Sequence, residues 1–472
     1  MADSLKFGTS GLRGLVTDLV GRPSQRYTLA FVAYLRGKGE IGEGGTILIG
    51  RDLRDSSPSI AASVIGAIRS AGLVAIDCGA VPTPALALEA MRLRLPAIMV
   101  TGSHIPADRN GLKFYVADGE IEKADELGIV KALAGLPEPD AVETPVDAGD
   151  PKVLQRYEDR YADLLGPRGL AGLTIGVYQH STVARDVLVR ILARAGAKVL
   201  ELGRSDIFVP VDTEALDPTD VARGRAWARE AALDAIVSSD GDADRPLIAD
   251  EKGAFLRGDV VGLLTARFLG ADVVVTPVTS NSSIEGTGFF KDVRRVKVGS
   301  PYVIDGMRQA SAAGARAVIG FEANGGVLAG SDFPARHLSA LPTRDAVLPI
   351  LAVLGLARQQ GIAVSELVAT LPPRFAKSDR LEHIPTERSA ALIGDLAAGS
   401  AATYFADIGP IADVSSIDGL RFVFADGNVI HYRPSGNAPE LRCYTEAATD
   451  ERAAELLQWG LAAARKAVSA GA

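Results

Sequence analysis

Residues 96–114, PAIMVTGSHIPADRNGLKF, carry the most informative pattern in the chain. The first five residues are apolar and predict a buried strand, and the turn after it presents Ser103 and His104, with Lys113 ten residues beyond the serine. A polar turn at the carboxyl end of a buried strand lies where α/β sheets bind ligands. A lysine near such a serine can activate the hydroxyl or stabilise an anion. Taken alone, the composition is also that of an ordinary Ser/Gly/Pro turn, so its meaning depends on the rest of the chain.

A strand, a polar loop, a helix and a second strand follow one another in a rhythm that recurs along the chain. This rhythm predicts parallel strands joined by right-handed crossovers, and three related mixed or parallel α/β domains. The units are strand 46–49, loop 50–57, helix 58–71 and strand 73–77; strand 173–177, loop 178–182, helix 184–195 and strand 198–202; and a third unit with strand 273–276, loop 277–283 and a strand near 295–298.

The rhythm changes after the prolines at 372 and 373. Strand-like segments 419–425 and 429–433 flank Asp426-Gly427-Asn428, which is a hairpin signal, and a helix over 451–467 follows. This part predicts a smaller α+β domain. We therefore expect four domains, with boundaries at 1–145, 146–254, 255–371 and 372–472.

Composition restricts the class of protein. The 472 residues carry a net charge of −8, which argues against a broad basic face for nucleic acid and favours a small ligand. The chain has two cysteines, no basic start followed by an apolar run, and no apolar stretch near the ~20 residues that span a bilayer. We expect a protein of a reducing, cytoplasmic compartment without a membrane anchor.

The segment SSDGDADRP, residues 238–246, follows an apolar strand and places Asp240, Asp242 and Asp244 at alternate positions. Three such carboxylates can converge on one hard cation, and magnesium suits a few carboxylates together with a phosphate oxygen. An EF-hand is disfavoured because Arg245 stands where that loop requires glycine. A solvated acidic turn is the remaining alternative, although unneutralised carboxylates so close together repel one another.

Three further loops have compositions suited to a phosphorylated sugar. GFEANGG, residues 320–326, places Glu322 and Asn324 two residues apart, so an extended loop would point both at paired hydroxyls. RPSGNAPELR, residues 433–442, offers the charge and donors that a phosphate monoester needs. FGTSGLRG, residues 7–14, adds close-set glycines and Arg13.

With these motifs in place, the chain resembles the α-D-phosphohexomutases over nearly its whole length. Residues 101–106 look like the family's T-A-S-H-N-P loop, whose serine carries a phosphoryl group, although Gly102 and Ile105 replace the alanine and asparagine. Residues 240–245 match its D-G-D-x-D-R magnesium loop, and Glu322 falls on its sugar-binding glutamate. The resemblance implies four domains around a central cleft.

The resemblance also implies a role for each candidate residue. The catalytic candidates are Ser103, His104, Lys113 and Arg245; the metal ligands are Ser103, Asp240, Asp242 and Asp244; and the substrate-binding candidates are Arg13, Glu322, Asn324, Arg433, Ser435, Gly436, Asn437 and Arg442. The expected cofactors are Mg²⁺ and a hexose 1,6-bisphosphate, which would serve as activator and intermediate.

The implied reaction interconverts hexose 1-phosphate and hexose 6-phosphate, with mannose or glucose as the sugar. A phosphoglucosamine mutase, a phosphatase and a phosphosugar-binding protein without turnover are the alternatives. The expected partner is a small phosphosugar rather than nucleic acid or membrane, and the expected state is a monomer or weak homodimer.

Overall fold

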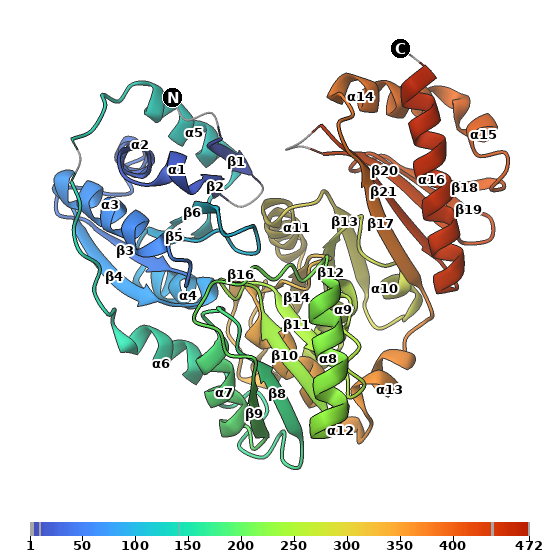
Figure 1. Ribbon diagram of the computed structural model, residues 1–472, viewed down its shortest axis with the longest axis horizontal. Helices are drawn as coiled ribbons and strands as arrows, with labels where there is room; N and C mark the ends of the chain where they lie inside the picture. Colours follow the sequence, from blue (N-terminus) through green and yellow to red (C-terminus); the bar gives the residue numbers. More distant parts are fainter. Residues whose placement is uncertain (1–3, 9–10, 141, 436–438, 471–472) are drawn as a thin grey trace. The chain divides into compact units, whose positions relative to one another are not determined.

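The computed structural model describes residues 4–8, 11–140, 142–435 and 439–470. The chain forms two compact units, one of residues 1–274 and 299–368, the other of residues 275–298 and 369–472 (Figure 1).

The first sheet of the larger unit supports the serine loop. Its strand order is β1-β2-β6-β5-β3-β4, with β7 paired to β6, and only β4, β3 and β5 run parallel to one another. Helix α3 lies on one face of these strands and α4 on the other (Figure 1). The elements are β1 Lys6–Gly8, β2 Gly11–Leu15, α1 Val16–Leu19, α2 Arg22–Gly37, β3 Thr46–Arg51, α3 Ser57–Ser70, β4 Val74–Ala80, α4 Thr83–Leu93, β5 Ala97–Val100, β6 Arg109–Val116, β7 Gly119–Glu120 and α5 Lys123–Ala134.

The second sheet supports the aspartate loop. Its order is β11-β10-β8-β9, with β10, β8 and β9 parallel and β11 antiparallel to β10. The aspartate loop is the connection between β10 and β11. The elements are α6 Pro151–Asp159, β8 Thr174–Tyr178, α7 Arg185–Arg194, β9 Lys198–Leu202, α8 Pro218–Ala231, β10 Ala235–Ser239 and β11 Pro246–Ala249.

Three antiparallel strands, β14, β15 and β16, complete the sheets of this unit. Helix α12 is buried from Val347 to Ala357, which explains its continuous apolar sequence as a core helix that packs against α9. The elements are α9 Gly258–Leu269, α11 Ser300–Ala312, β14 Val318–Phe321, β15 Val327–Ala329, a short 3₁₀ turn Pro334–Arg336, β16 Leu341–Asp345, α12 Val347–Gln360 and α13 Val364–Ala369.

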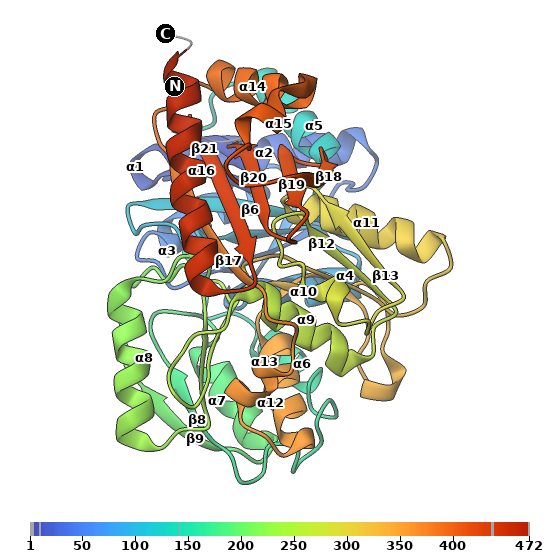
Figure 2. The same cartoon turned by 90° about the vertical axis from the view of Figure 1, so that its right-hand side faces the viewer.

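The smaller unit contains an antiparallel sheet of order β17-β21-β20-β19-β18, and α16 runs along one face of it (Figure 2). The predicted hairpin is confirmed, because Gly427 lies in the turn between β19 and β20 with a φ of 79°. The elements are α10 Ser283–Gly286, β13 Asp292–Val296, β17 Phe375–Leu381, α14 Thr386–Asp395, a π-helical segment Leu396–Ser400, α15 Ala401–Tyr404, β18 Ile411–Ser415, β19 Leu420–Phe424, β20 Val429–Pro434, β21 Leu441–Ala447 and α16 Asp450–Ala470; β12, Val273–Pro277, joins the two units along the chain.

An ionic cluster links α4 to α6 within the larger unit. Glu89 accepts hydrogen bonds from Arg92 at 2.8 Å and from Arg156 at 2.7 Å. Burial alone would raise the pKa of Glu89, but the hydrogen bonds from Arg92 and Arg156 hold that pKa below its ordinary value of 4.5. The charged form of Glu89 therefore contributes to the stability of the folded state.

Replacing Arg156 by alanine is expected to lower the free energy of unfolding by up to about 1 kcal/mol at pH 7, because the Arg156 side chain is partly exposed to solvent and Arg92 still pairs with Glu89. A group with a depressed folded-state pKa stabilises the fold above its unfolded-state pKa, and this contribution is lost as the pH falls through the folded-state value. The difference between wild type and variant should thus shrink below pH 4.5. Urea unfolding at pH 7 and pH 3.5 measures it, and an equal difference at both pH values would contradict the assignment.

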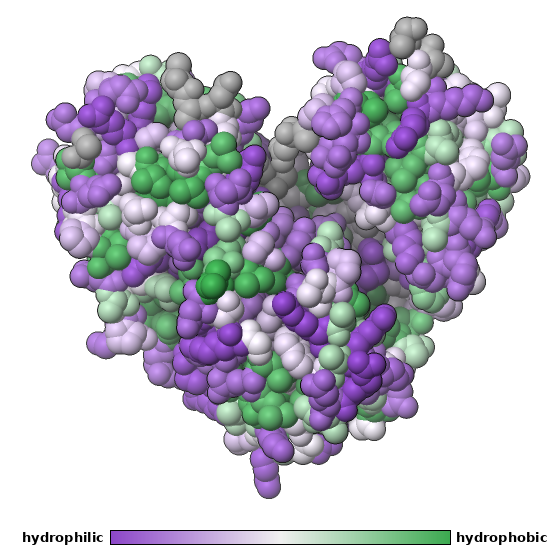
Figure 3. Space-filling model, viewed as in Figure 1, coloured by the Kyte–Doolittle hydropathy of each residue, from purple (hydrophilic) through white to green (hydrophobic). Residues whose placement is uncertain are grey.

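No helix in the described part of the chain is long and apolar enough to cross a membrane. Hydrophilic side chains predominate on the face shown in Figure 3, and the apolar ones form small separate groups.

Candidate active site

Ser103 lies in a tight turn after β5, between residues fixed by buried hydrogen bonds. Its backbone is left-handed, with a φ of 54°, which a non-glycine residue adopts only when its surroundings impose it. The Thr101 hydroxyl supplies that constraint, since it accepts from the Ser103 N–H at 2.8 Å and donates to Asp52 at 2.7 Å. The turn therefore presents the serine hydroxyl in one defined direction.

The side chain of Arg54 also binds this turn. The sequence motifs did not indicate this role. Its side chain is buried, and its guanidinium donates to the carbonyl oxygens of Ser103, Ile105, Pro106 and Arg109 at 2.5–3.0 Å. A Cβ atom at Gly102 would lie 2.5 Å from Arg54 Cζ. This contact gives a physical reason for glycine at 102, where the family loop has alanine.

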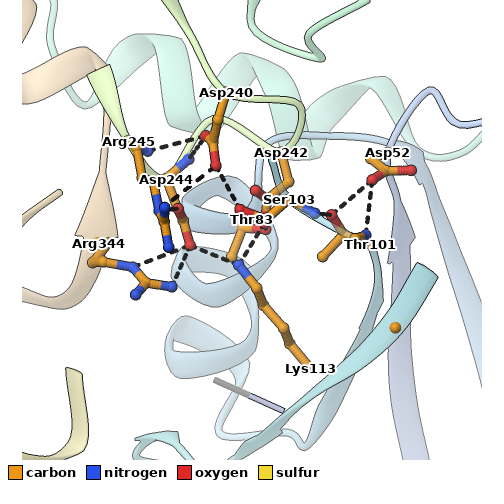
Figure 4. Close-up of polar contacts among 12 residues, drawn as sticks. Asp52, Thr83, Thr101, Ser103, Lys113, Asp240, Asp242, Asp244, Arg245 and Arg344 are labelled. Atoms are coloured by element: carbon orange, nitrogen blue, oxygen red, sulfur yellow. Dashed lines mark hydrogen bonds and ion pairs between the residues drawn. The ribbon is translucent and has the colours of Figure 1, made fainter. Parts of the chain in front are cut away.

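The three aspartates of the β10–β11 loop converge on the serine, as predicted. Asp240, Asp242 and Asp244 are buried, and one carboxylate oxygen of each lies within 4.8 Å of the others. The Ser103 hydroxyl donates to Asp240 Oδ2 at 2.6 Å (Figure 4). The alternative of a solvated acidic turn is wrong, because all three side chains are out of contact with solvent.

The free oxygens of this trio suit a metal ion. Lys113 Nζ contacts Asp242 Oδ2 and Asp244 Oδ2, each at 2.6 Å. Among the described residues, Asp242 Oδ1 and Asp244 Oδ1 are buried without a hydrogen-bond partner. Buried carboxylate oxygens without partners are costly unless a cation completes them. The trio could therefore hold a metal ion with oxygen ligands.

The carboxylates differ in their protonation behaviour. Burial, with the neighbouring charges of Asp242 and Asp244, raises the pKa of Asp240 well above its usual range. Burial would also raise the pKa of Asp244, but Arg344 and Lys113 outweigh it and hold that pKa below its usual range.

His104 and Lys113 are also brought to the serine, with opposite proton affinities. His104 Nδ1 lies 3.2 Å from Ser103 Oγ, and burial together with Arg245 and Arg13 holds the pKa of the imidazole below its usual range. Burial would lower the pKa of Lys113, but Asp242 and Asp244 raise it. The imidazole is therefore neutral and the lysine charged.

Two predicted arginines border the cluster. Arg245 Nε lies 3.9 Å from Asp240 Oδ2 and 3.7 Å from Asp244 Oδ1. Burial lowers the pKa of Arg13 to about 10, and repulsion from the nearby charges of Arg245 and Arg344 contributes to this shift. Both guanidinium groups belong to the same charged cluster as the aspartates.

The expected extended loop around Glu322 is wrong. The segment after β14 is a hydrogen-bonded turn, in which Gly325 N–H donates to the Glu322 carbonyl at 3.0 Å and Glu322 N–H donates to the Gly326 carbonyl at 3.1 Å. The Asn324 amide oxygen accepts from Gly326 N–H at 2.9 Å, so it serves the turn. Glu322 instead meets Arg344, whose Nη1 lies 2.8 Å from Oε2.

Arg344 and Thr83 are two further site residues that the motifs did not reveal. Arg344 contacts Asp244 Oδ2 through Nη2 at 2.6 Å, and the Thr83 hydroxyl donates to Asp242 Oδ2 at 2.6 Å. The only signal for Arg344 in the sequence was an arginine beside Asp345 before the apolar run of α12, and Thr83 stands at the start of α4.

The predicted phosphate loop lies in the smaller unit and is described in part. Arg433, near the end of β20, contacts Asp418 Oδ2 at 2.7 Å, and Ser435 N–H donates to the Glu440 carbonyl at 2.9 Å. Arg442 Nη2 lies 3.5 Å from Glu440 Oε2. Gly436 and Asn437 lie outside the described residues.

Four family models match this chain in order along its length. Their descriptions are the phosphoglucomutase/phosphomannomutase alpha/beta/alpha domains I, II and III and the C-terminal domain, over residues 4–138, 159–253, 257–375 and 384–458. The fold and the site thus define a multidomain α/β mutase architecture.

Relatives with established names agree with these models. A phosphomannomutase of Sinorhizobium fredii is 51% identical over 466 residues, covering 97% of this chain and 98% of the relative. A phosphomannomutase of Salmonella muenchen is 43% identical over 460 residues, covering 96% and 94%. The chain therefore belongs to the phosphoglucomutase/phosphomannomutase family, the α-D-phosphohexomutases.

One solved structure and one more distant relative extend the comparison. A family member from Burkholderia thailandensis has a TM-score of 0.77 at 22% identity, with 98% of each chain covered. A phosphoglucosamine mutase of Thermobifida fusca is 27% identical over 465 residues, covering 95% of each chain. The phosphomannomutases above are thus much closer in sequence than this phosphoglucosamine mutase.

Proposed function

We propose that this protein interconverts hexose 1-phosphate and hexose 6-phosphate through phosphorylated Ser103, with mannose phosphate as the first substrate to test. The observation that carries the proposal is the 2.6 Å hydrogen bond from the Ser103 hydroxyl into the buried aspartate trio. The two relatives at 51% and 43% identity, both named phosphomannomutase, favour mannose over glucosamine. Glucose 1-phosphate remains the second substrate to compare.

The charges around Ser103 support a phosphoserine and a dication together. The carboxylates Asp240, Asp242, Asp244 and Glu322 lie among basic side chains, which include Arg13, Lys113, Arg245 and Arg344. A phosphorylated serine carries roughly −1.5 to −2 charges near neutrality, which the two positive charges of a bound divalent ion would offset.

We assign the ion as Mg²⁺, held by Asp240, Asp242, Asp244 and an oxygen on Ser103. Magnesium prefers a few carboxylates combined with phosphate oxygens, and the Oδ1 atoms of Asp242 and Asp244, which have no hydrogen-bond partner among the described residues, are suitable ligands. When bound, the ion neutralises charge on the transferring phosphoryl group.

The forward step moves the phosphoryl group from Ser103 Oγ to a free hydroxyl of the sugar. The phosphorus–oxygen bond to Ser103 breaks as the bond to the sugar oxygen forms, and the proton of that hydroxyl must leave. We assign its acceptance to His104, because His104 Nδ1 lies 3.2 Å from Ser103 Oγ, whereas the ammonium of Lys113 already donates to two carboxylates. The fixed charge of Arg245 steadies the group in transfer.

The resulting hexose 1,6-bisphosphate reverses its orientation and returns its other phosphate to Ser103. In this proposal Glu322 and Asn324 bind hydroxyls common to both orientations, and Arg13 also contributes to substrate binding. The loop of Arg433, Ser435, Gly436, Asn437 and Arg442 binds the phosphate that is not reacting. Binding energy from that remote phosphate positions the reacting end.

The remaining assignments follow from the sequence. We propose domain limits at 1–145, 146–254, 255–371 and 372–472, a cytoplasmic location and a monomer or weak homodimer. Cys78 and Cys443 are free and buried, which suits a reducing compartment.

Incubation with mannose 1-phosphate, Mg²⁺ and a trace of glucose 1,6-bisphosphate is expected to yield mannose 6-phosphate, measured by phosphorus-31 NMR. Free phosphate as the main product would instead indicate a phosphatase, and binding without any product would indicate a phosphosugar-binding protein. Parallel incubations with glucose 1-phosphate and glucosamine 1-phosphate rank the three sugars, and glucosamine as the fastest substrate would overturn the assignment to hexose phosphates.

A further inference from the structure

Arg344 bridges two loops that the proposed reaction assigns to different tasks. Its side chain is buried at the end of β16. Nη2 and Nε contact Asp244 Oδ2 at 2.6 and 3.1 Å (Figure 4). Nη1 contacts Glu322 Oε2 at 2.8 Å. One planar group therefore touches both an aspartate of the proposed metal loop and the carboxylate of the proposed sugar loop.

The residues beside Arg344 fix the strand that carries it. The Asp345 carboxylate accepts from the Tyr157 hydroxyl and from Val347 N–H, both at 2.8 Å, and it also accepts from Tyr161. On the other side, the Thr343 hydroxyl donates to Glu120 Oε1 at 2.7 Å. The backbone at 344 is thus anchored through both of its neighbours.

The aliphatic part of the Arg344 side chain is enclosed by its neighbours. A Cβ atom at Gly326 would lie 2.6 Å from Arg344 Cδ, so the glycine leaves the space that the arginine stem occupies. Because the stem is enclosed and the guanidinium is planar, the two carboxylates that it contacts are held in a fixed relation.

The contacts also determine which oxygen of Asp244 is left for an ion. Arg344 and Lys113 both contact Oδ2, the lysine at 2.6 Å. Oδ1 is without a hydrogen-bond partner among the described residues. Because Lys113 and Arg344 hold one oxygen of the Asp244 carboxylate, they fix the direction in which its other oxygen, the one proposed to ligate the ion, points.

We propose that Arg344 is a positioning residue that couples the metal loop to the sugar loop through Asp244 and Glu322. This inference rests on the proposed function for the roles of the two loops. A sugar bound at Glu322 then favours the orientation of Asp244 that the metal ion needs, and an ion bound at Asp244 favours the orientation of Glu322 that the sugar needs. By linkage, each ligand changes the affinity for the other by the same factor.

Arg344→Lys is the informative variant, because it keeps the positive charge but cannot contact both carboxylates as the planar fork does. Mn²⁺ affinity, measured by electron paramagnetic resonance on dephosphorylated protein, is compared without and with saturating mannose 6-phosphate. In wild type we expect mannose 6-phosphate to strengthen Mn²⁺ binding about five-fold or more. In Arg344→Lys this ratio should fall toward one, with Mn²⁺ affinity itself about ten-fold weaker.

Two further variants separate coupling from general damage. Glu322→Gln should lower the same ratio, and adding Arg344→Lys to it should lower the ratio no further. Arg336→Met is the matched control, since this arginine donates to the Phe268 carbonyl and stacks on its ring without touching the site residues. It should keep the wild-type ratio, and thermal melting checks that each variant is folded.

A folded Arg344→Lys protein with the wild-type ratio would overturn the inference, as would an equal loss of coupling in Arg336→Met. These outcomes are independent of turnover, because the measurement is of binding. Absence of mannose 6-phosphate formation by wild type would remove the proposed function and leave the coupling measurement intact.

Discussion

Ser103→Ala is expected to lower the mutase rate by roughly 10⁴-fold or more, the scale seen when a covalent nucleophile is removed. The hydroxyl that points into the aspartate trio is the atom that would carry the phosphoryl group between the two ends of the sugar. Alanine retains the backbone of the turn but cannot form the phosphate ester. Phosphorus-31 NMR of mannose 1-phosphate turnover measures the loss.

Ser63→Ala is a suitable control for this variant. Ser63 is also buried, and its hydroxyl donates to the Ser59 carbonyl within α3, away from the aspartates. Its variant should turn over at the wild-type rate. Mass spectrometry should find a phosphoryl group on residue 103 of wild type after exposure to glucose 1,6-bisphosphate, and full mutase activity in a folded Ser103→Ala protein would refute the nucleophile.

Asp242→Asn is expected to lower the rate by about 10³-fold, because it removes a charged oxygen from the metal site. Asp242 accepts from Lys113 and Thr83 through Oδ2, so its other oxygen is directed by two fixed donors. An amide in the same place presents either an oxygen without full charge or an N–H to the ion. Metal affinity should therefore fall together with activity.

Thermal melting measures the metal effect without turnover. An ion present at 100 times its dissociation constant adds about 2.7 kcal/mol to wild-type stability, so Mg²⁺ should raise the wild-type melting temperature and chelator should reverse the rise. Asp242→Asn should show little of this rise. Asp250→Asn, which changes a turn that binds Lys252 and Ala254 N–H groups, is the control and should behave as wild type. A full Mg²⁺ response in Asp242→Asn would contradict the assignment of this ligand.

The serine and aspartate loops were predictable because their chemistry is concentrated in a few consecutive residues. Asp240, Asp242 and Asp244 alternate in one loop after an apolar strand, and this spacing is enough to indicate convergence. The rhythm of strands and helices likewise predicted the α/β units, since burial imposes the hydrophobic pattern directly. Local composition therefore sufficed for these parts.

Features that depend on contacts between distant residues were not predictable. Arg344 reaches Asp244 from a strand one hundred residues further along, and nothing in its own neighbourhood shows that partner. The Ser57 hydroxyl at the start of α3 donates to Asp52 at 2.5 Å, a contact that the residues next to Ser57 in the sequence do not indicate. The Asn324 turn differs from the expected extended loop for a similar reason, because its amide completes backbone bonds within the loop.

The four carbonyl contacts of Arg54 have a consequence for how the proposed intermediate is handled. These contacts hold the backbone of the serine loop in place, so we do not expect the loop to move during the reaction. The bisphosphate itself must then reorient, so that its second phosphate reaches a serine that stays in the same position. Retention of the bisphosphate while it reorients must therefore depend on residues outside the serine loop, because the loop is held by Arg54.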